Sequence, residues 1–141
     1  MIDEFLKKWL IKAIEDFNAS KYIVNLSDEK ILTSIVCFHC QQTVEKLFKA
    51  YLITKKIDFA KTHDLELLIK LCVDLDNEFK NISIDHLSDY AVEIRYPDEF
   101  YIPSIEEAKK CFEIASNVKD FIFKKLEIKE EDLVKNEKRG S

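Results

Sequence analysis

The chain has 141 residues, the usual size of one domain, and 47% of them are hydrophobic while 35% are charged. Its net charge of −5 excludes a generally basic nucleic-acid-binding protein, because non-specific binding depends on neutralising phosphates with Lys and Arg. The only glycine is Gly140, and no apolar stretch is long enough to span a membrane, which excludes glycine-rich phosphate loops and transmembrane helices.

The first half of the chain predicts three helices. Residues 3–25 carry apolar side chains at spacings of three and four, as an amphipathic helix does. Residues 28–55 follow as a long helix, for which Ser27 is the expected N-cap. Thr62 is expected to cap a third helix at about 64–75.

The second half predicts a loop at 76–81 and two further helices. Ser83 is expected to cap a helix that runs to about Arg95, because Pro97 pushes the preceding residue out of the helical region. Ser104 and Glu107 form a capping-box pattern that starts a helix reaching about residue 125.

Long helices with short connections predict an all-α fold, an up-and-down bundle of four to five helices. We expect this domain at residues 1–127 and a charged C-terminal tail at 128–141. The helix at 105–125 is apolar on two neighbouring sides, which is more than one bundle contact needs and favours a homodimer. The first residues lack the charge order of a signal peptide, so we expect a cytoplasmic protein that has no membrane contact.

The four cysteines, Cys37, Cys40, Cys72 and Cys111, are expected to be buried free thiols. Cys37 and Cys40 have the spacing of a zinc-ligand pair, but the second close pair that a structural zinc site requires is missing. The sequence therefore predicts neither a metal site nor a cofactor.

The helix at 28–55 is apolar nearly all round, which is typical of a central helix. Its middle nevertheless carries a concentrated polar set: His39, Gln41, Gln42, Glu45, Lys46 and Lys49. One interpretation is an exposed flank on which Glu45 and Lys49 form an ordinary ion pair one turn apart. The other is a polar cleft whose cations and amides meet a phosphate or a base.

Three further residues are ambiguous in the same way. His63 either bonds locally at the start of its helix or joins the cleft as a phosphate donor or proton carrier. Arg95 either offers its planar fork to an anion or forms a salt bridge to Glu45, Glu93 or Asp98. His86 has no comparable polar neighbours in the sequence and is expected to be a surface or structural residue.

Four blocks of residues, in this order, resemble the HEPN family. They are Trp9, Ala13 and Asp16; the run Phe38-His39-Cys40-Gln41-Gln42-Thr43-Val44-Glu45-Lys46-Leu47-Phe48-Lys49-Ala50; Thr62-His63-Asp64-Leu65; and Tyr90 with Arg95-Tyr96-Pro97-Asp98. The second block is long and specific, and the resemblance covers roughly residues 5–125.

The resemblance implies a helical homodimer that often accompanies a small nucleotidyltransferase in toxin–antitoxin-like pairs. Many members of the family are metal-independent ribonucleases whose catalytic Arg is followed, after four to six residues, by His. After Arg95 those positions hold Phe100, Tyr101 and Ile102, so this sequence lacks the pattern and leaves catalytic residues unassigned.

The resemblance and the polar cleft together predict a nucleotide-binding site made of His39, Gln42, Lys46, Lys49, His63 and Arg95. The leading hypothesis is a homodimer that binds a nucleotide, RNA or a nucleotidyltransferase through this cleft. One alternative is a metal-independent ribonuclease that uses Arg95 with His39 or His63. Another is a structural interaction module whose polar residues only fix the register of the bundle.

Overall fold

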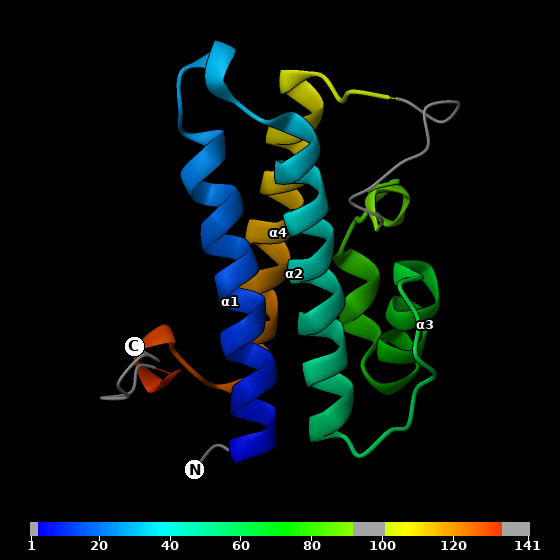
Figure 1. The fold of residues 1–141 in the computed structure, drawn as a ribbon. Helices are drawn as coiled ribbons and strands as arrows, with labels where there is room; N and C mark the ends of the chain where they lie inside the picture. The colour runs from blue at the N-terminus through cyan, green and yellow to red at the C-terminus, as the bar shows by residue number, and fades with distance from the viewer. Residues whose placement is uncertain (1–2, 92–100, 134–141) are drawn as a thin grey trace.

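A computed structural model describes residues 3–91 and 101–133, and every regular element in these ranges is helical (Figure 1). The α-helices are α1 (Glu4–Val24), α2 (Thr33–Thr54), α3 (Leu65–Leu75) and α4 (Ile105–Leu126). Short 3-10 helices are η1 (Asp28–Lys30), η2 (Asn77–Asn81), η3 (Leu87–Tyr90) and η5 (Glu130–Leu133). The predicted all-α helical bundle is confirmed, and none of the described helices is long and apolar enough to cross a bilayer.

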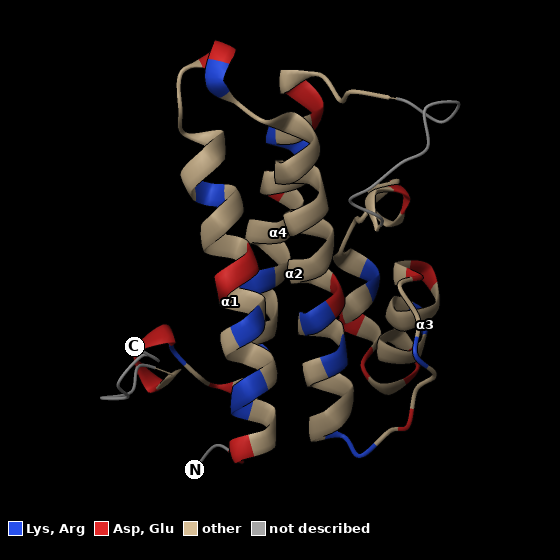
Figure 2. Cartoon of the chain, viewed as in Figure 1, with Lys and Arg blue, Asp and Glu red and all other residues tan. Residues whose placement is uncertain are grey.

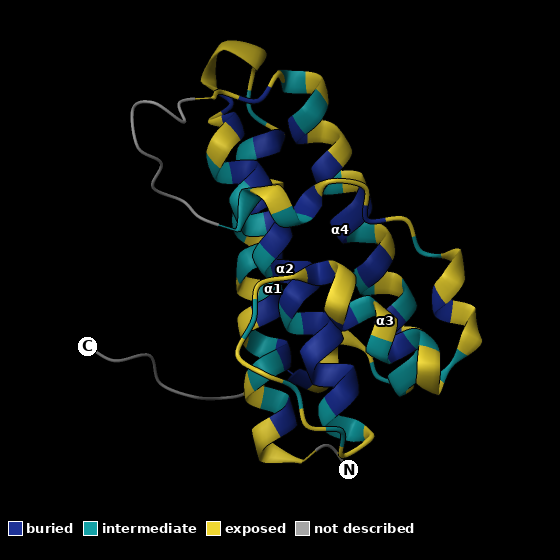
Figure 3. Cartoon of the chain, turned by 90° about the vertical axis from the view of Figure 1, so that its right-hand side faces the viewer, coloured by how far each residue is buried: buried dark blue, intermediate teal, exposed yellow. Residues whose placement is uncertain are grey.

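The three long helices lie side by side, and α2 occupies the centre. α1 runs antiparallel to α2 and α4, which point the same way (Figure 1). α2 packs against α1, α4, α3 and η3, and 14 of its 22 residues are buried. Figure 3 shows it largely in the colour of buried residues. The predicted central position of this helix is confirmed.

The ends of α1 and α4 follow from local sequence. Asp3 accepts a hydrogen bond from the backbone of Leu6 and caps α1. At the start of α4 the backbone N–H of Glu107 donates to Ser104 Oγ at 3.0 Å, and the carboxylate of Glu107 accepts from the backbone N–H of Ser104 at 3.2 Å. Both halves of the predicted capping box are therefore present.

The predicted start of α2 was wrong. Residues 28–30 form only the short helix η1, and the hydroxyl of Ser27 donates to Glu29 without capping a backbone N–H. Ile31 is extended, at φ −73° and ψ 115°, and its side chain is buried. Burial of this residue in an extended conformation breaks the helical run, so α2 begins only at Thr33.

Two other predicted caps also require correction. α3 is capped by Asp64, which accepts from the backbone N–H groups of Glu66 and Leu67, whereas Thr62 accepts only from Asp64. Ser83 caps nothing, because its hydroxyl donates to Asp85, whose left-handed φ of 47° interrupts a helix there.

The predicted fourth α-helix is thus reduced to η3 in the described part of the chain, and η2 replaces the loop expected at 76–81. The expected end of that helix, at residues 92–97, lies outside the described residues.

Both apolar sides of α4 are covered within the chain. Cys111, Ile114, Val118 and Ile122 are buried. Phe112 stacks on Phe17 of α1 at 5.1 Å between ring centroids, and Phe121 packs edge-on against Phe79 at 4.9 Å. α4 therefore does not supply the surplus apolar surface from which we expected a homodimer, and that expectation depends on the family resemblance alone.

Candidate functional site

The polar residues in the middle of α2 are gathered around two carboxylates, one on α1 and one on α2 itself. Figure 2 shows acidic and basic segments together in the middle and lower parts of the two helices. Each carboxylate binds one imidazole and one lysine. The arrangement is thus repeated on two sides of α2.

The first carboxylate is Asp16 of α1. Its Oδ1 lies 2.8 Å from Nδ1 of His39, and its Oδ2 accepts a hydrogen bond from Nζ of Lys46. His39 and Lys46 are seven residues apart, so two turns of α2 place them on the same side, toward α1. Only 13% of the Asp16 side chain and 23% of the Lys46 side chain are exposed, so this group helps to fix α1 against α2.

The second carboxylate is Glu45, which is buried. Its Oε1 lies 2.8 Å from Nδ1 of His63 and accepts from Nε2 of Gln41 at 3.1 Å. Its Oε2 accepts from Nζ of Lys49 at 3.0 Å. Gln41 also donates to the backbone carbonyl of His63 at 3.2 Å, so the segment before α3 is fastened to α2 at this point.

Two opposing effects act on the pKa of Glu45. Burial raises it, because a charged carboxylate is poorly solvated in the interior. The hydrogen bonds from His63, Lys49 and Gln41 together outweigh burial, and the pKa of Glu45 lies below its ordinary value. The ionised form is therefore the one that the fold stabilises.

Gln42 lies between the two groups and is hydrogen-bonded to the group around Glu45. Its Nε2 donates to Oε1 of Gln41 at 2.7 Å, and at 100° per residue it lies between the side of His39 and the side of Glu45. We call the whole set the α2 cluster: Asp16, His39, Gln41, Gln42, Glu45, Lys46, Lys49 and His63. No buried side-chain nitrogen or oxygen among the described residues lacks a hydrogen-bond partner.

Two aromatic rings cover Lys49. Its Nζ lies 5.8 Å from the ring centroid of Trp9 and 5.8 Å from that of Phe59, and the two rings meet edge-on at 6.4 Å. Phe59 reaches this place because Lys56 adopts a left-handed φ of 58°, which turns the chain back after α2. The backbone N–H of Ile57 then bonds the carbonyl of Leu52 at 3.0 Å, as in a Schellman motif.

Five of the six predicted site residues therefore lie in the α2 cluster: His39, Gln42, Lys46, Lys49 and His63. The sixth, Arg95, lies outside the described residues. The predicted ion pair of Glu45 and Lys49 is present, but both side chains are buried, so an exposed flank is excluded for this pair.

Sequence reasoning did not assign Asp16, Gln41 and Glu45 to the site, although Glu45 was predicted as the ion-pair partner of Lys49. Asp16 is part of the first block of residues that resembles the HEPN family, and that block was the sequence signal that could have identified it as a site residue. Gln41 directly precedes Gln42 in the second pattern, although it lies on a different side of the helix.

Each imidazole of the cluster is oriented by a carboxylate. Because Nδ1 of both His39 and His63 faces a carboxylate, Nε2 is the nitrogen left for another partner, and the described residues supply none for it. A neutral ring offers a lone pair at Nε2 and can accept a proton; a protonated ring donates from Nε2 and can bind an anion. The side chain of His63 is 64% exposed, which makes it the more accessible of the two.

The cysteines do not contribute to this chemistry. All four are buried free thiols, as predicted. Burial raises the pKa of Cys40 and of Cys72 to about 12, so both remain protonated and unreactive at neutral pH. In the described ranges no group of three His, Cys, Asp or Glu residues is placed to hold a metal ion.

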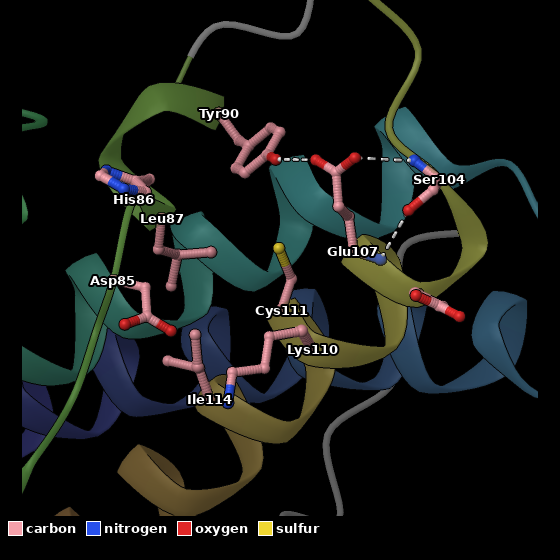
Figure 4. A pocket seen from close by; sticks show the side chains of 10 residues that line it. Asp85, His86, Leu87, Tyr90, Ser104, Glu107, Lys110, Cys111 and Ile114 are labelled. Atoms are coloured by element: carbon pink, nitrogen blue, oxygen red, sulfur yellow. Dashed lines mark hydrogen bonds between the residues drawn. The ribbon is translucent and has the colours of Figure 1, made fainter.

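A cavity of about 380 Å³ lies elsewhere, between η3 and the first half of α4 (Figure 4). His86 lines it and is exposed, in keeping with the surface position expected for it.

Glu107, which also lines this cavity, is held by several hydrogen bonds. Tyr90 donates to the carboxylate of Glu107 at 2.9 Å. Hydrogen bonds from Tyr101, from the backbone of Ser104 and from Tyr90 hold the pKa of Glu107 below its ordinary value. This carboxylate thus accepts hydrogen bonds from Tyr90, Tyr101 and Ser104 and ties η3 to the start of α4.

A comparison of the sequence with models of known families identifies the same family that the sequence motifs resemble. The family model of the HEPN domain matches residues 6–127, which is most of the chain and includes every element from α1 to α4. The chain belongs to the HEPN domain family. Searches of curated proteins and of solved structures gave no significant match.

Proposed function

We propose that this HEPN-domain protein binds the phosphate of a nucleotide or of RNA at the α2 cluster, as one partner of a nucleotidyltransferase pair. The observation that carries the proposal is the orientation of His39 and His63. A carboxylate binds Nδ1 of each imidazole, so Nε2 has no partner among the described residues; when the ring carries both protons, Nε2 donates to a phosphate oxygen.

The charge balance of the cluster sets the strength of such binding. Asp16 neutralises Lys46, and Glu45 neutralises Lys49, so the lysines alone leave no net positive charge. Binding therefore depends on individual hydrogen-bond donors more than on net charge, and Lys46 is the more exposed of the two lysines. We expect moderate affinity that weakens with rising salt.

Equilibrium binding tests the proposal directly. We expect calorimetric titration with ATP, and with a short 5′-phosphorylated RNA, to show binding below millimolar concentration. His63→Gln should weaken it about tenfold, the scale of one hydrogen bond to a charged group. His86→Gln is the matched control, because His86 is an exposed histidine outside the cluster and its loss should change nothing. No binding at millimolar ligand would refute the proposal and favour a structural interaction module.

From the sequence, we still expect Arg95 to contribute to phosphate binding. If it binds the same phosphate, Arg95→Ala should weaken binding by roughly 1–3 kcal/mol, and Arg95→Lys should restore only part of the loss, because an ammonium cannot replace a planar fork. Circular dichroism of Arg95→Ala separates this role from a structural salt bridge, which would lower helicity without changing the affinity of the folded molecules.

A second candidate is metal-independent cleavage of RNA. It is favoured by the same orientation of the imidazoles, since a carboxylate that fixes Nδ1 leaves Nε2 able to accept the proton of a 2′-hydroxyl. Incubation of the protein with RNA in the presence of a chelator tests this candidate. Cleavage that is abolished by a 2′-deoxy substitution at the scission site and lost in His63→Gln would support it.

A further inference from the structure

A second cavity, of about 370 Å³, lies directly beside the α2 cluster. Its walls come from the first turns of α1, the last turn of α2 and the segment after α2: Phe5, Trp9, Ile53, Lys56, Ile57, Asp58 and Phe59. Trp9 and Phe59 are also the rings that cover Lys49, so one pair of side chains forms the boundary between the cavity and the cluster.

Five of the seven residues that line this cavity are aromatic or aliphatic, and the other two are Lys56 and Asp58. Phe5, Trp9 and Phe59 supply three rings, and Ile53 and Ile57 supply aliphatic surface. Phe5 is 58% exposed, although it is a large apolar side chain on a helix. The exposed ring of Phe5 at the mouth of the cavity offers a flat apolar face, which favours an occupant that contains a planar ring. The volume falls in the range of small-ligand sites.

Three lysines lie at or near this cavity, and two of them are paired with carboxylates of the α2 cluster. Lys56 lines the mouth of the cavity, Lys49 lies behind the rings, and Lys46 lies one turn further along the same side of α2. Lys46 is paired with Asp16 and Lys49 with Glu45, so Lys56 is the lysine of this set that has no ion pair among the described residues and can attract the anion of an occupant. Asp58 also lies at the mouth and can accept a hydrogen bond from an amino or hydroxyl group.

A planar ring system, hydrogen-bond donors and an attached anion occur together in a nucleotide. We propose that this cavity holds the base of a nucleotide or of an RNA end between Phe5, Trp9 and Phe59, with the phosphate directed toward the α2 cluster. The inference rests on the proposed function, to which it adds recognition of the base. Aromatic stacking accepts any base, so recognition here is of the class of ligand and not of a sequence.

Trp9 makes the inference directly measurable, because it is the only tryptophan in the chain. Stacking of a base on its ring quenches its fluorescence. We expect adenosine 5′-monophosphate and a 5′-phosphorylated RNA oligonucleotide to quench Trp9 saturably, and comparison of the two identifies the better source of the base. Adenosine should quench with lower affinity, since it lacks the phosphate. Ribose 5-phosphate, which lacks the base, should bind more weakly and cause no quenching.

Variants of the ring at the mouth complete the test. Phe5→Ala should weaken binding of adenosine 5′-monophosphate roughly tenfold, the scale of one stacking contact, and leave binding of ribose 5-phosphate unchanged. Because Phe5 is exposed, this variant should fold normally; Phe59→Ala is the second variant and should act in the same direction. Tyr22→Ala is the matched control, an exposed aromatic residue of α1 that does not line the cavity.

The possible failures can be told apart. If calorimetry shows nucleotide binding but Trp9 is not quenched and Phe5→Ala binds like the wild type, the base site is wrong and the phosphate site stands. If neither nucleotide nor RNA binds at millimolar concentration, both proposals fail. If a blocked phenylalanine peptide quenches Trp9 as strongly as the nucleotide does, the cavity is a peptide site and the inference is overturned.

Discussion

His63 presents an imidazole that is 64% exposed, yet its Nδ1 is bonded at 2.8 Å to the carboxylate of Glu45, of which only 5% is exposed. The buried carboxylate of Glu45 thus orients the exposed imidazole of His63. The other oxygen of the same carboxylate, Oε2, accepts from the buried ammonium of Lys49 and neutralises it. Glu45 therefore links a buried lysine of the bundle to an imidazole at its surface.

Replacement of Glu45 by Gln should be strongly destabilising. The change leaves the ammonium of Lys49 buried without a counter-charge, and loss of one partner of a buried pair typically costs about 3–5 kcal/mol. The double variant Glu45→Gln with Lys49→Met removes both charges and should recover much of the loss. Urea unfolding of the two variants and of Lys49→Met completes a double-mutant cycle. Equal stability of Glu45→Gln and the wild type would show that the pair contributes nothing.

Acid should destabilise the protein partly through Glu45. Its pKa is lower in the folded chain than in the unfolded chain, so its contribution is present above the ordinary glutamate pKa and is lost as the pH falls through the lower, folded value. The free energy of unfolding should therefore decrease from pH 5 toward pH 3. The double variant lacks this titrating group and should show a shallower decrease over the same interval. Parallel curves for the two proteins would exclude the effect.

Asp16→Asn should affect stability and binding in opposite directions. Loss of the carboxylate removes the partner of Lys46 and of His39 at the contact between α1 and α2, which should cost about 1–3 kcal/mol. The same change raises the net charge of the α2 cluster by one, so a phosphate should bind more tightly, most clearly at low salt. Thermal unfolding and calorimetric titration with ATP measure the two effects. Weaker binding by the folded variant would mean that Asp16 orients a ligand-binding His39.

The buried thiols provide a test of the core. We expect all four cysteines to react slowly with a thiol reagent in the native protein and rapidly in guanidinium chloride, since each is buried and burial raises the pKa of Cys40 and Cys72 to about 12. The matched control is Ser34→Cys, which places a thiol at an exposed position of α2 and should add one fast-reacting group. Fast reaction of a native cysteine would show that its helix opens readily.

The sequence predicted those features that depend on neighbours along the chain. The cap of α4 requires two residues three positions apart, and the pair of Glu45 and Lys49 requires two residues one turn apart. Both were found where local rules placed them. The all-helical fold follows in the same way from apolar spacing within each segment.

Features that depend on distant residues could not be predicted from local rules. Asp16 meets its two partners 23 and 30 positions along the chain, and no spacing rule connects them. The extended conformation of Ile31 follows from burial of its side chain, which outweighs the helical tendency of its neighbours. Helix boundaries and the assembly of the α2 cluster are therefore tertiary effects.

The end of α4 provides a final prediction about backbone strain. Glu127 follows the helix with a left-handed φ of 55° and ψ of 45°, a conformation that favours glycine because a Cβ is crowded there. Glu127→Gly should stabilise the protein by about 0.5–1 kcal/mol, the strain relieved less the added entropy of the unfolded chain.

The control for this prediction is Glu127→Ala, which also removes a carboxylate from the unfavourable C-terminal end of a helix dipole but keeps the Cβ. It should gain only a few tenths of a kcal/mol. Urea unfolding of both variants separates strain from charge: a glycine variant no more stable than the alanine variant would show that the left-handed turn carries no measurable strain.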